Sequence, residues 1–422
     1  MSTDAGRSPW RGRLLALSGI LLVALNLRAA VASLAPVADR ISTDVPLDAI
    51  VLGVLGAAPP LAFALAGILT PRISARFGIE HTLLGAILLL GAGQLFRAFA
   101  SGATAGPVVV LVGSVVAFVG IGVGNVLMPP IVRRYFPDRI GTVTSGYVTV
   151  QQVGATVAPL IAVPLAVVVG WRLSIGSWGV VAVLAAVPWV VELTRTHGRE
   201  TRAAAGLAAA REAPIGRAIW RSPTAWAMAA GFSSTSAVAY VVFSAFPALL
   251  HGVAHLDDAT GGAFVALFSF VGLPLAIVMP QLAARLRSSV GPALFSIVLS
   301  FAGFLGLLLA PAVAPLLWMV LISLGAAFFP YSLALVGVRS RTQAGALALS
   351  GFMQGVGYTA GALGPLLVGI LHAVTGGWTA PLIVLLIATV PLVPAAIVLS
   401  RPRFVEDEVL RPVRSEGAPQ AR

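Results

Sequence analysis

An arginine lies close to the middle of the first long apolar run of the chain. Residues 14–36 are predominantly apolar, and Arg28 stands just beyond their midpoint. A charge at such a depth in a membrane costs about 2.5–3.5 kcal/mol on insertion scales, so it must face protein or a water-filled cavity. The planar guanidinium group suits an anionic or electron-rich ligand. Arg28 is therefore a candidate ligand-binding residue, and the alternative is a structural cap on backbone carbonyl groups.

Two further apolar runs carry the same stripe of polar and small side chains. Each stripe has members at relative positions 0, 4, 7 and 11, which lie on one face of an α-helix. The first stripe is Tyr147, Gln151, Gly154 and Ala158, and the second is Gln354, Tyr358, Gly361 and Pro365. Taken singly, each polar member is explained by a hydrogen bond between membrane helices. The match between the stripes supports a second explanation, in which their tyrosines and glutamines line a substrate cavity.

Two asparagines and a second arginine also interrupt apolar runs. Asn26 is two residues from Arg28, about 200° around a helix, so the two side chains cannot share a face. We expect Asn26 to bond a neighbouring helix, with substrate contact as the alternative, and the same two roles are open to Asn125. Arg97 lies near the end of its run, where snorkelling to the membrane interface costs little. We expect its charge to lie at that interface.

The composition of the chain shows which elements must hold these side chains. Hydrophobic residues make up 58% of the sequence and charged residues 10%. An average soluble domain has about 25% charged residues, so lipid must solvate most of this chain. Windows with the roughly 20 apolar residues that a span requires fall at 14–36, 49–70, 82–100, 107–132, 142–169, 172–193, 223–250, 261–283, 291–310, 315–337, 345–371 and 379–400. The sequence predicts an all-α integral membrane protein with twelve transmembrane helices.

The arginines predict how the chain is oriented in the membrane. All 27 basic residues are arginines, and most of them flank alternate ends of the apolar windows. Because positive residues are retained in the cytoplasm, we expect both termini there and the protein in the inner cell membrane. The net charge of +12 is then a topology signal and not a nucleic-acid-binding patch. Residues 194–222, the longest polar stretch, are expected to be cytoplasmic and to form a short interfacial helix.

This polar stretch separates two sets of six windows that resemble each other. Residues 71–76 resemble residues 280–285, and residues 124–129 resemble residues 325–330. The two polar stripes are a third match at a similar offset, and membrane transporters often carry duplicated halves. We therefore expect an N-terminal six-helix half at 1–193, a linker at 194–222, a C-terminal six-helix half at 223–400 and a cytoplasmic tail at 401–422.

Three motifs in the apolar windows resemble one family of membrane proteins. They are residues 24–28 (Ala-Leu-Asn-Leu-Arg), 122–129 (Gly-Val-Gly-Asn-Val-Leu-Met-Pro) and 353–358 (Met-Gln-Gly-Val-Gly-Tyr). Over nearly its whole length the chain resembles the cyanate and nitroimidazole transporter family of the major facilitator superfamily. The resemblance implies the major facilitator fold, with two pseudo-symmetric halves and alternating access. It also implies a small anion such as cyanate, or a small nitroheteroaromatic compound, as the substrate.

The loop motif of that superfamily is incomplete in this chain. A member usually has Gly-x-Leu-x-Asp-Arg-x-Gly-Arg-Arg after its second span, and residues 71–80 keep only Arg76 and Gly78 of its conserved Arg and Gly positions. Ala75 stands at the Asp position, so this loop does not provide the carboxylate of the usual inner gate. The internal repeat places Arg285 at the corresponding point of the second half. The resemblance implies gating roles for Arg76, Gly78 and Arg285.

Residue types that are missing from the windows exclude other classes of protein. All fifteen acids and five histidines lie in tails, loops or window ends, Glu192 being the deepest acid, and the chain has no cysteine. We therefore expect no enzyme activity, no cofactor and no metal site. A glycine pattern at 355–360 lies inside a window, so Gly351 and Gly355 are expected at a close helix contact and not at a nucleotide.

The alternatives to this interpretation come from two classes. Within the transporters, the rival is a permease that exports hydrophobic drugs or metabolites. Outside them, it is a membrane-embedded enzyme or sensor, which would require intramembrane acid or histidine pairs, or a soluble output domain. We expect the partners to be a small-molecule substrate and the lipid bilayer, with no nucleic acid, and we expect the monomer to be functional.

Overall fold

The chain folds into membrane-length helices joined by short loops. The computed structural model describes residues 13–47, 49–102, 104–196 and 215–409, and no strand occurs within these ranges. In the same ranges, twelve helices are long and apolar enough to cross a membrane. The predicted all-α fold with twelve spans is confirmed.

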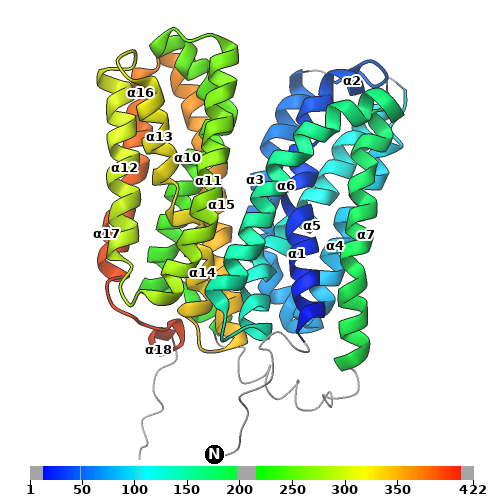
Figure 1. The fold of residues 1–422 in the computed structure, drawn as a ribbon, viewed down its shortest axis with the longest axis vertical. Coiled ribbons are helices and arrows are strands. Elements are labelled where there is room, and N and C mark those ends of the chain that lie inside the picture. The colour runs from blue at the N-terminus through cyan, green and yellow to red at the C-terminus, as the bar shows by residue number, and fades with distance from the viewer. Residues whose placement is uncertain (1–12, 48, 103, 197–214, 410–422) are drawn as a thin grey trace, which may run out of the picture.

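The first six spans form one bundle, at the right of Figure 1. Its spans are α1 (Leu14–Ala32), α3 (Ala49–Phe77), α4 (Ile79–Ala98), α5 (Ala105–Tyr135), α6 (Ile140–Val169) and α7 (Trp171–Thr196). A 3-10 turn at Ala35–Val37 and the short helix α2 (Ala38–Ser42) follow α1. They lie at the upper end of this N-terminal half (Figure 1).

The last six spans form the second bundle, at the left of Figure 1. Its elements are α9 (Ile215–Ala218), a 3-10 turn (Ile219–Arg221), α10 (Pro223–Ala254), α11 (Asp258–Arg285), α12 (Val290–Leu309), α13 (Pro315–Gly325), α14 (Phe328–Val338), α15 (Gln343–Thr375), α16 (Thr379–Thr389), α17 (Leu392–Val398) and α18 (Val405–Val409). The linker was predicted at 194–222, and its central part, 197–214, lies outside the described residues. Most of the interfacial helix expected in the linker therefore lies outside the described residues.

Two spans of the C-terminal half are each divided into two helices. The tenth span consists of α13 and α14, and the twelfth of α16 and α17. Pro330 lies in the first turn of α14 and Pro391 directly before α17. Proline lacks the N–H that a helix interior requires and is accepted at a helix start, so each span breaks about one turn or less before its proline.

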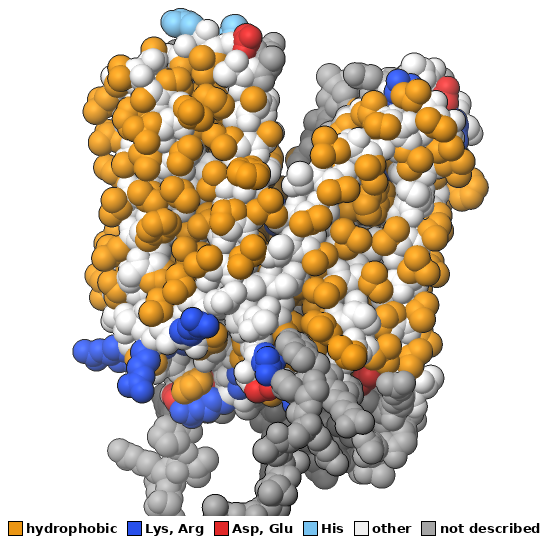
Figure 2. All heavy atoms as spheres, viewed as in Figure 1, with side chains coloured by type: hydrophobic (Ala, Val, Ile, Leu, Met, Phe, Trp, Pro, Cys, Tyr) orange, Lys and Arg blue, Asp and Glu red, His pale blue; other side chains and the backbone are white. Residues whose placement is uncertain are grey.

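The two halves meet at their lower ends and are separated by a cleft at the upper end (Figure 2). Small residues allow helices α3 and α15 of the two halves to approach each other closely. A Cβ atom on Gly67 of α3 would lie 2.4 Å from the backbone of Gly355 of α15, and one on Gly351 would lie 2.7 Å from the carbonyl oxygen of Gly67. Gly351 and Gly355 therefore mark a close helix contact, as the sequence predicted, and that contact joins the two halves.

The surface is apolar over its middle and carries most of its visible arginines at the lower end (Figure 2). α18 lies at this same end (Figure 1). A band of apolar side chains bounded by charges is what a membrane-spanning protein requires. The cytoplasmic assignment of the lower end stays a prediction from the arginine distribution.

The first part of the predicted C-terminal tail is folded against the C-terminal half. Glu406 of α18 is buried and accepts a hydrogen bond from the backbone N–H of Thr342 (2.9 Å), at the start of α15. Glu408 accepts one from the backbone N–H of Thr224 (3.1 Å), at the start of α10. Carboxylates are stabilised at helix N-termini, so α18 caps two spans of this half.

Candidate functional site

Arg28 points from the N-terminal half toward the C-terminal half. It lies on α1, is half-buried, and its guanidinium carbon is 5.8 Å from the ring centroid of Phe329 in α14. Tyr240 in α10 and Tyr358 in α15 lie within electrostatic reach of this guanidinium group. No carboxylate of the described residues lies within 4.0 Å of it. Arg28 is therefore a cation between the halves without an acidic partner in that part of the chain.

Aromatic rings from both halves cluster near Arg28, and Tyr358 contacts three of them. Its ring centroid is 5.2 Å from that of Phe63, 5.1 Å from that of Phe232 and 6.4 Å from that of Tyr240. Phe232 in turn lies 4.9 Å from Phe329. A guanidinium group among ring edges and faces can hold a flat, electron-rich molecule.

Tyr147 of α6 is buried near Tyr358 of α15, so the tyrosines of the two stripes approach the same place from opposite halves. In the described residues, no protein group bonds the hydroxyl group of Tyr147, and none is found for Tyr240 or Tyr358. A Cβ atom on Gly361 would lie 3.0 Å from the Tyr240 ring. The small residue of the second stripe thus makes room for this tyrosine.

The two stripe glutamines and Asn125 form a hydrogen-bonded bridge between the halves. The side-chain amide of Gln151 in α6 donates to Oδ1 of Asn125 in α5 (3.3 Å). The side-chain amide of Gln354 in α15 donates to the backbone carbonyl of Asn125 (3.1 Å). All three residues are buried. The structure therefore joins Gln151 to Gln354 through Asn125, and in this conformation the glutamines bond protein groups.

Asn26 lies away from Arg28, inside the N-terminal half. Its side-chain amide donates to the carbonyl oxygen of Leu22 (3.1 Å), and it lines a cavity of about 10 Å³ together with Leu90 of α4 and Gly120 of α5. The prediction that Asn26 and Arg28 occupy different faces of one helix is confirmed. This position favours the structural role for Asn26, and substrate contact stays a prediction.

The interpretation of Arg97 as a snorkelling residue is wrong. Its side chain is fully buried, and its Nη2 atom donates to the carbonyl oxygen of Ala30 in α1 (3.2 Å). Gly93 and Gly113 let α4 and α5 approach so closely that a Cβ atom on Gly113 would lie 2.8 Å from Cβ of Arg97. Because α5 packs against Cβ of Arg97 and α1 provides the acceptor, the Arg97 side chain points into the N-terminal half and not to the membrane interface.

Comparison with known proteins identifies the architecture that holds this site. A family model described as Major Facilitator Superfamily matches residues 17–362. The chain belongs to the major facilitator superfamily. Its members are transporters, so this major facilitator protein is a membrane transporter and not an enzyme.

Three similar proteins extend over most of the chain. An uncharacterised transporter of Bacillus subtilis is 33% identical over 92% of this chain and 94% of its own length. A 2-nitroimidazole transporter of Escherichia coli is 31% identical over 88% and 92%. A cyanate transport protein of Escherichia coli is 24% identical over 85% and 90%. The predicted resemblance to the cyanate and nitroimidazole transporters is confirmed.

A solved structure of a proton:xylose symporter of the same superfamily has the same fold. Its TM-score is 0.71 at 16% sequence identity, over 94% of this chain and 97% of the symporter chain. At this identity the likeness establishes the major facilitator fold alone, and that fold implies alternating access.

The residues predicted to act as gates lie at the lower surface of this transporter. Arg76, Gly78 and Arg285 are exposed. The guanidinium carbon of Arg76 lies 5.5 Å from the ring centroid of its neighbour Phe77. Gly78 has φ +84° and makes the tight turn between α3 and α4, which explains the glycine. Their roles in gating stay predictions, because other residues close the lower end in this conformation.

The closing contacts run from side chains of one half to backbone carbonyls of the other. Gln343 donates to Pro130 (3.2 Å) and Gln152 donates to Ser269 (3.0 Å). Arg133 donates to Gly337, and Ser145 to Ile277. These contacts could not be predicted from the sequence, because every residue type carries the same backbone acceptor. The site aromatics Phe63, Phe232 and Phe329 were missed because phenylalanine in an apolar window looks like ordinary core.

Ala75 stands where the superfamily motif has a carboxylate, and the next helix provides a carboxylate in its first turn. Glu80 in the first turn of α4 is buried and lies 3.0 Å from Nε of Arg134 at the end of α5. It also accepts a hydrogen bond from the hydroxyl group of Tyr135 (3.1 Å). These contacts lie inside the N-terminal half. Glu80 therefore joins α4 to α5 and does not join the two halves.

Proposed function

We propose that this transporter moves a small anion, or a small flat solute with electron-rich oxygen atoms such as a nitroheteroaromatic compound. The observation that carries the proposal is the half-buried guanidinium group of Arg28, which faces the other half without a carboxylate within 4.0 Å among the described residues. A buried cation is stabilised by an opposite charge or by electron-rich acceptors. A substrate in the cleft provides that partner.

The aromatic rings favour a flat substrate. Phe329 lies beside Arg28, and Tyr358 and Phe232 extend the apolar wall in the C-terminal half. Ring faces attract the positive edges of a flat heteroaromatic solute, and phenol groups can donate to its oxygen atoms. The names of two similar proteins, a 2-nitroimidazole transporter and a cyanate transport protein, fit such a site.

Alternating access explains why the site draws on both halves. Arg28 belongs to the N-terminal half and Phe329 to the C-terminal half, so a bound substrate bridges them. The cleft is open at the upper end, and the bridge through Asn125 belongs to the closed contact between the halves. Taking the lower end as cytoplasmic, this conformation admits substrate from outside. Transport then requires the lower contacts to break while the upper end closes.

The proposal is tested by uptake and efflux assays on the full chain in membrane vesicles. The substrates are cyanate, 2-nitroimidazole, the same ring without its nitro group as a matched control, and a lipophilic cation. We expect saturable transport of cyanate or 2-nitroimidazole and little transport of the control ring. Transport of the lipophilic cation alone would contradict the proposal and favour a hydrophobic-drug exporter.

A further inference from the structure

Arg97 is an unusual charge among the buried side chains of this transporter. Its side chain is fully enclosed in the N-terminal half, and no carboxylate of the described residues lies within 4.0 Å. Nη2 bonds Ala30, whereas Nε and Nη1 have no protein partner in the described part of the chain. Burying a guanidinium group without a counter-charge is strongly unfavourable, so its one protein acceptor calls for an explanation.

That acceptor is a carbonyl group that the helix itself leaves unbonded. Ala30 lies in the last turn of α1, where carbonyl groups lack helical donors. The N–H of Ser33 donates to Ala29 (3.0 Å), and the N–H of Leu34 turns back to Val31 (3.4 Å). Arg97 supplies the donor that Ala30 lacks, and places a positive charge at the negative end of the helix. Arg97 therefore caps the C-terminus of the helix that carries Arg28.

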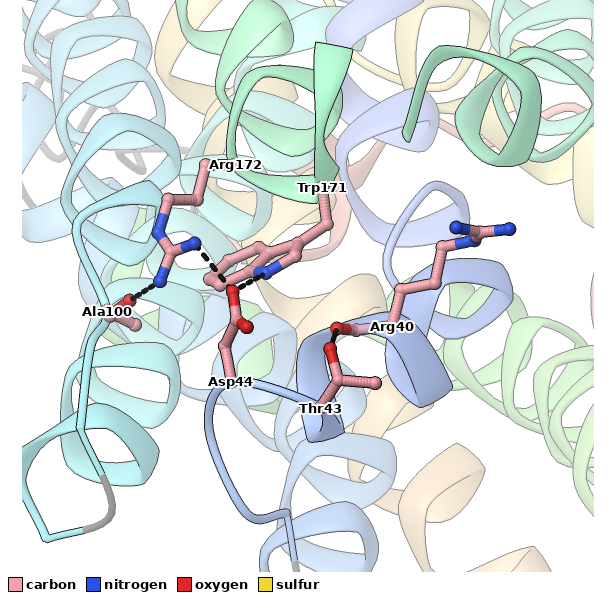
Figure 3. A network of polar contacts seen from close by, with 6 residues as sticks. All are labelled: Arg40, Thr43, Asp44, Ala100, Trp171 and Arg172. Carbon is pink, nitrogen blue, oxygen red and sulfur yellow. Dashed lines mark hydrogen bonds and ion pairs between the residues drawn. The ribbon is translucent and has the colours of Figure 1, made fainter. Parts of the chain in front are cut away.

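A second arginine lies at the same end of the N-terminal half and forms its hydrogen bonds with residues outside α1 (Figure 3). Arg172 at the start of α7 donates to Oδ2 of Asp44 (2.7 Å) and to the carbonyl oxygen of Ala100 (3.0 Å). The indole N–H of Trp171 also donates to Asp44 (2.9 Å). This network joins the loop after α2 to the segment that follows α4 and to the start of α7. It offers a matched control, because it lies at the same end and involves an arginine but no residue of α1.

We propose that Arg97 is a positioning residue for the substrate site. It fixes the end of α1 from inside the N-terminal half, and so sets how far Arg28, two residues before Ala30, reaches between the halves. Two residues correspond to about 200° around a helix, so Arg97 holds α1 on one side while Arg28 projects from the other. The inference rests on the proposed function only in taking Arg28 as the substrate residue.

The test measures the position of residue 28 without a substrate. The chain contains no cysteine, so Arg28→Cys introduces a single thiol. Its rate of reaction with a small membrane-impermeant methanethiosulfonate is compared in backgrounds with Arg97, Arg97→Lys, Arg97→Met and the control Arg172→Gln. We expect Arg97→Met to slow labelling about tenfold or more, since displacements near 1 Å at a site have effects of up to about a hundredfold. Arg97→Lys should restore most of the rate, and Arg172→Gln should leave it unchanged.

The other outcomes decide whether Arg97 has a positioning role or a purely structural one, and whether Arg28 lies in the cleft. Unchanged labelling in folded Arg97→Met, judged by a single symmetric elution peak in detergent, would overturn the positioning role. Loss of folded protein in Arg97→Met would move the comparison to Arg97→Gln, and loss in all three Arg97 variants would assign the residue to stability alone. An unreactive thiol at position 28 in the Arg97 background would instead contradict the placement of Arg28 in the cleft, and with it the proposed function.

Discussion

Two arginines interrupt apolar spans of the N-terminal half, and their surroundings differ in one decisive respect. Arg28 is half-buried and faces an aromatic wall that belongs to the other half. Arg97 is fully buried and bonds a carbonyl group of its own half. Contacts between the halves must change during alternating access, whereas contacts within a half are kept. This difference is the reason why we propose substrate binding for the first arginine and helix positioning for the second.

The largest expected effect is that of removing the charge at Arg28. Arg28→Ala should lower transport of the accepted probe about 100-fold, the usual cost of truncating one partner of a buried charge pair. Arg28→Lys should also impair transport, because the planar fork that matches paired oxygen atoms is lost. The measurement is initial uptake rate at equal membrane abundance, with Arg40→Ala, an exposed residue of α2 at the upper end, as the control. Full transport by folded Arg28→Ala would reduce Arg28 to a structural role.

The second prediction concerns the bridge between the halves. Gln151 and Gln354 are buried in this conformation, and their thiol replacements should become reactive when the lower end opens. Single Gln151→Cys and Gln354→Cys variants should react with a small polar thiol reagent during transport. A covering substrate at ten times its dissociation constant should slow both reactions about tenfold. Inert thiols in a transport-active protein would show that both glutamines only pack helices.

The third prediction concerns protons, because no acid or histidine of the sequence lies in the middle of an apolar window. With a substrate that has no pKa near the working range, we expect an imposed pH gradient at clamped voltage to cause no accumulation in proteoliposomes. Any coupling must use an edge group such as Glu192, partly buried near the lower end of α7. Accumulation that disappears in Glu192→Gln would support that route. Accumulation that survives neutralisation of every span-end acid and histidine would contradict the argument.

The smallest effect is expected at Asp44, in the network with Trp171 and Arg172 (Figure 3). Hydrogen bonds from Trp171 and Arg172 hold the pKa of this exposed carboxyl below its ordinary value. The stabilisation is therefore present above the unfolded pKa, about 3.9, and is lost as the pH falls through the lower folded pKa. Asp44→Asn should lower the melting temperature slightly at pH 7 and make no difference well below pH 3. Equal melting temperatures at pH 7 would show that the network adds no stability.

Patterns within single segments of the sequence were enough to predict the membrane spans and the faces that some side chains occupy on one helix. Twelve apolar windows correspond to twelve spans because a membrane accepts only segments of sufficient apolar length. The opposite faces of Asn26 and Arg28 followed from helix periodicity alone. Gly351 and Gly355 were predicted at a close contact, because small residues are what such contacts require.

Only the tertiary structure determined which hydrogen-bond partner each buried polar group has. Arg97 was expected at the interface from its place in the sequence, yet α1 offers it a free carbonyl group inside the half. Gln354 meets the backbone of Asn125, and Gln343 and Arg133 close the lower end on other backbone groups. Apolar length and helix period are properties of one segment, so the sequence determines them directly. Which acceptor on another helix comes within hydrogen-bonding distance is determined only when the helices pack. Every residue type has a backbone carbonyl group, so the sequence does not mark the one that will be used.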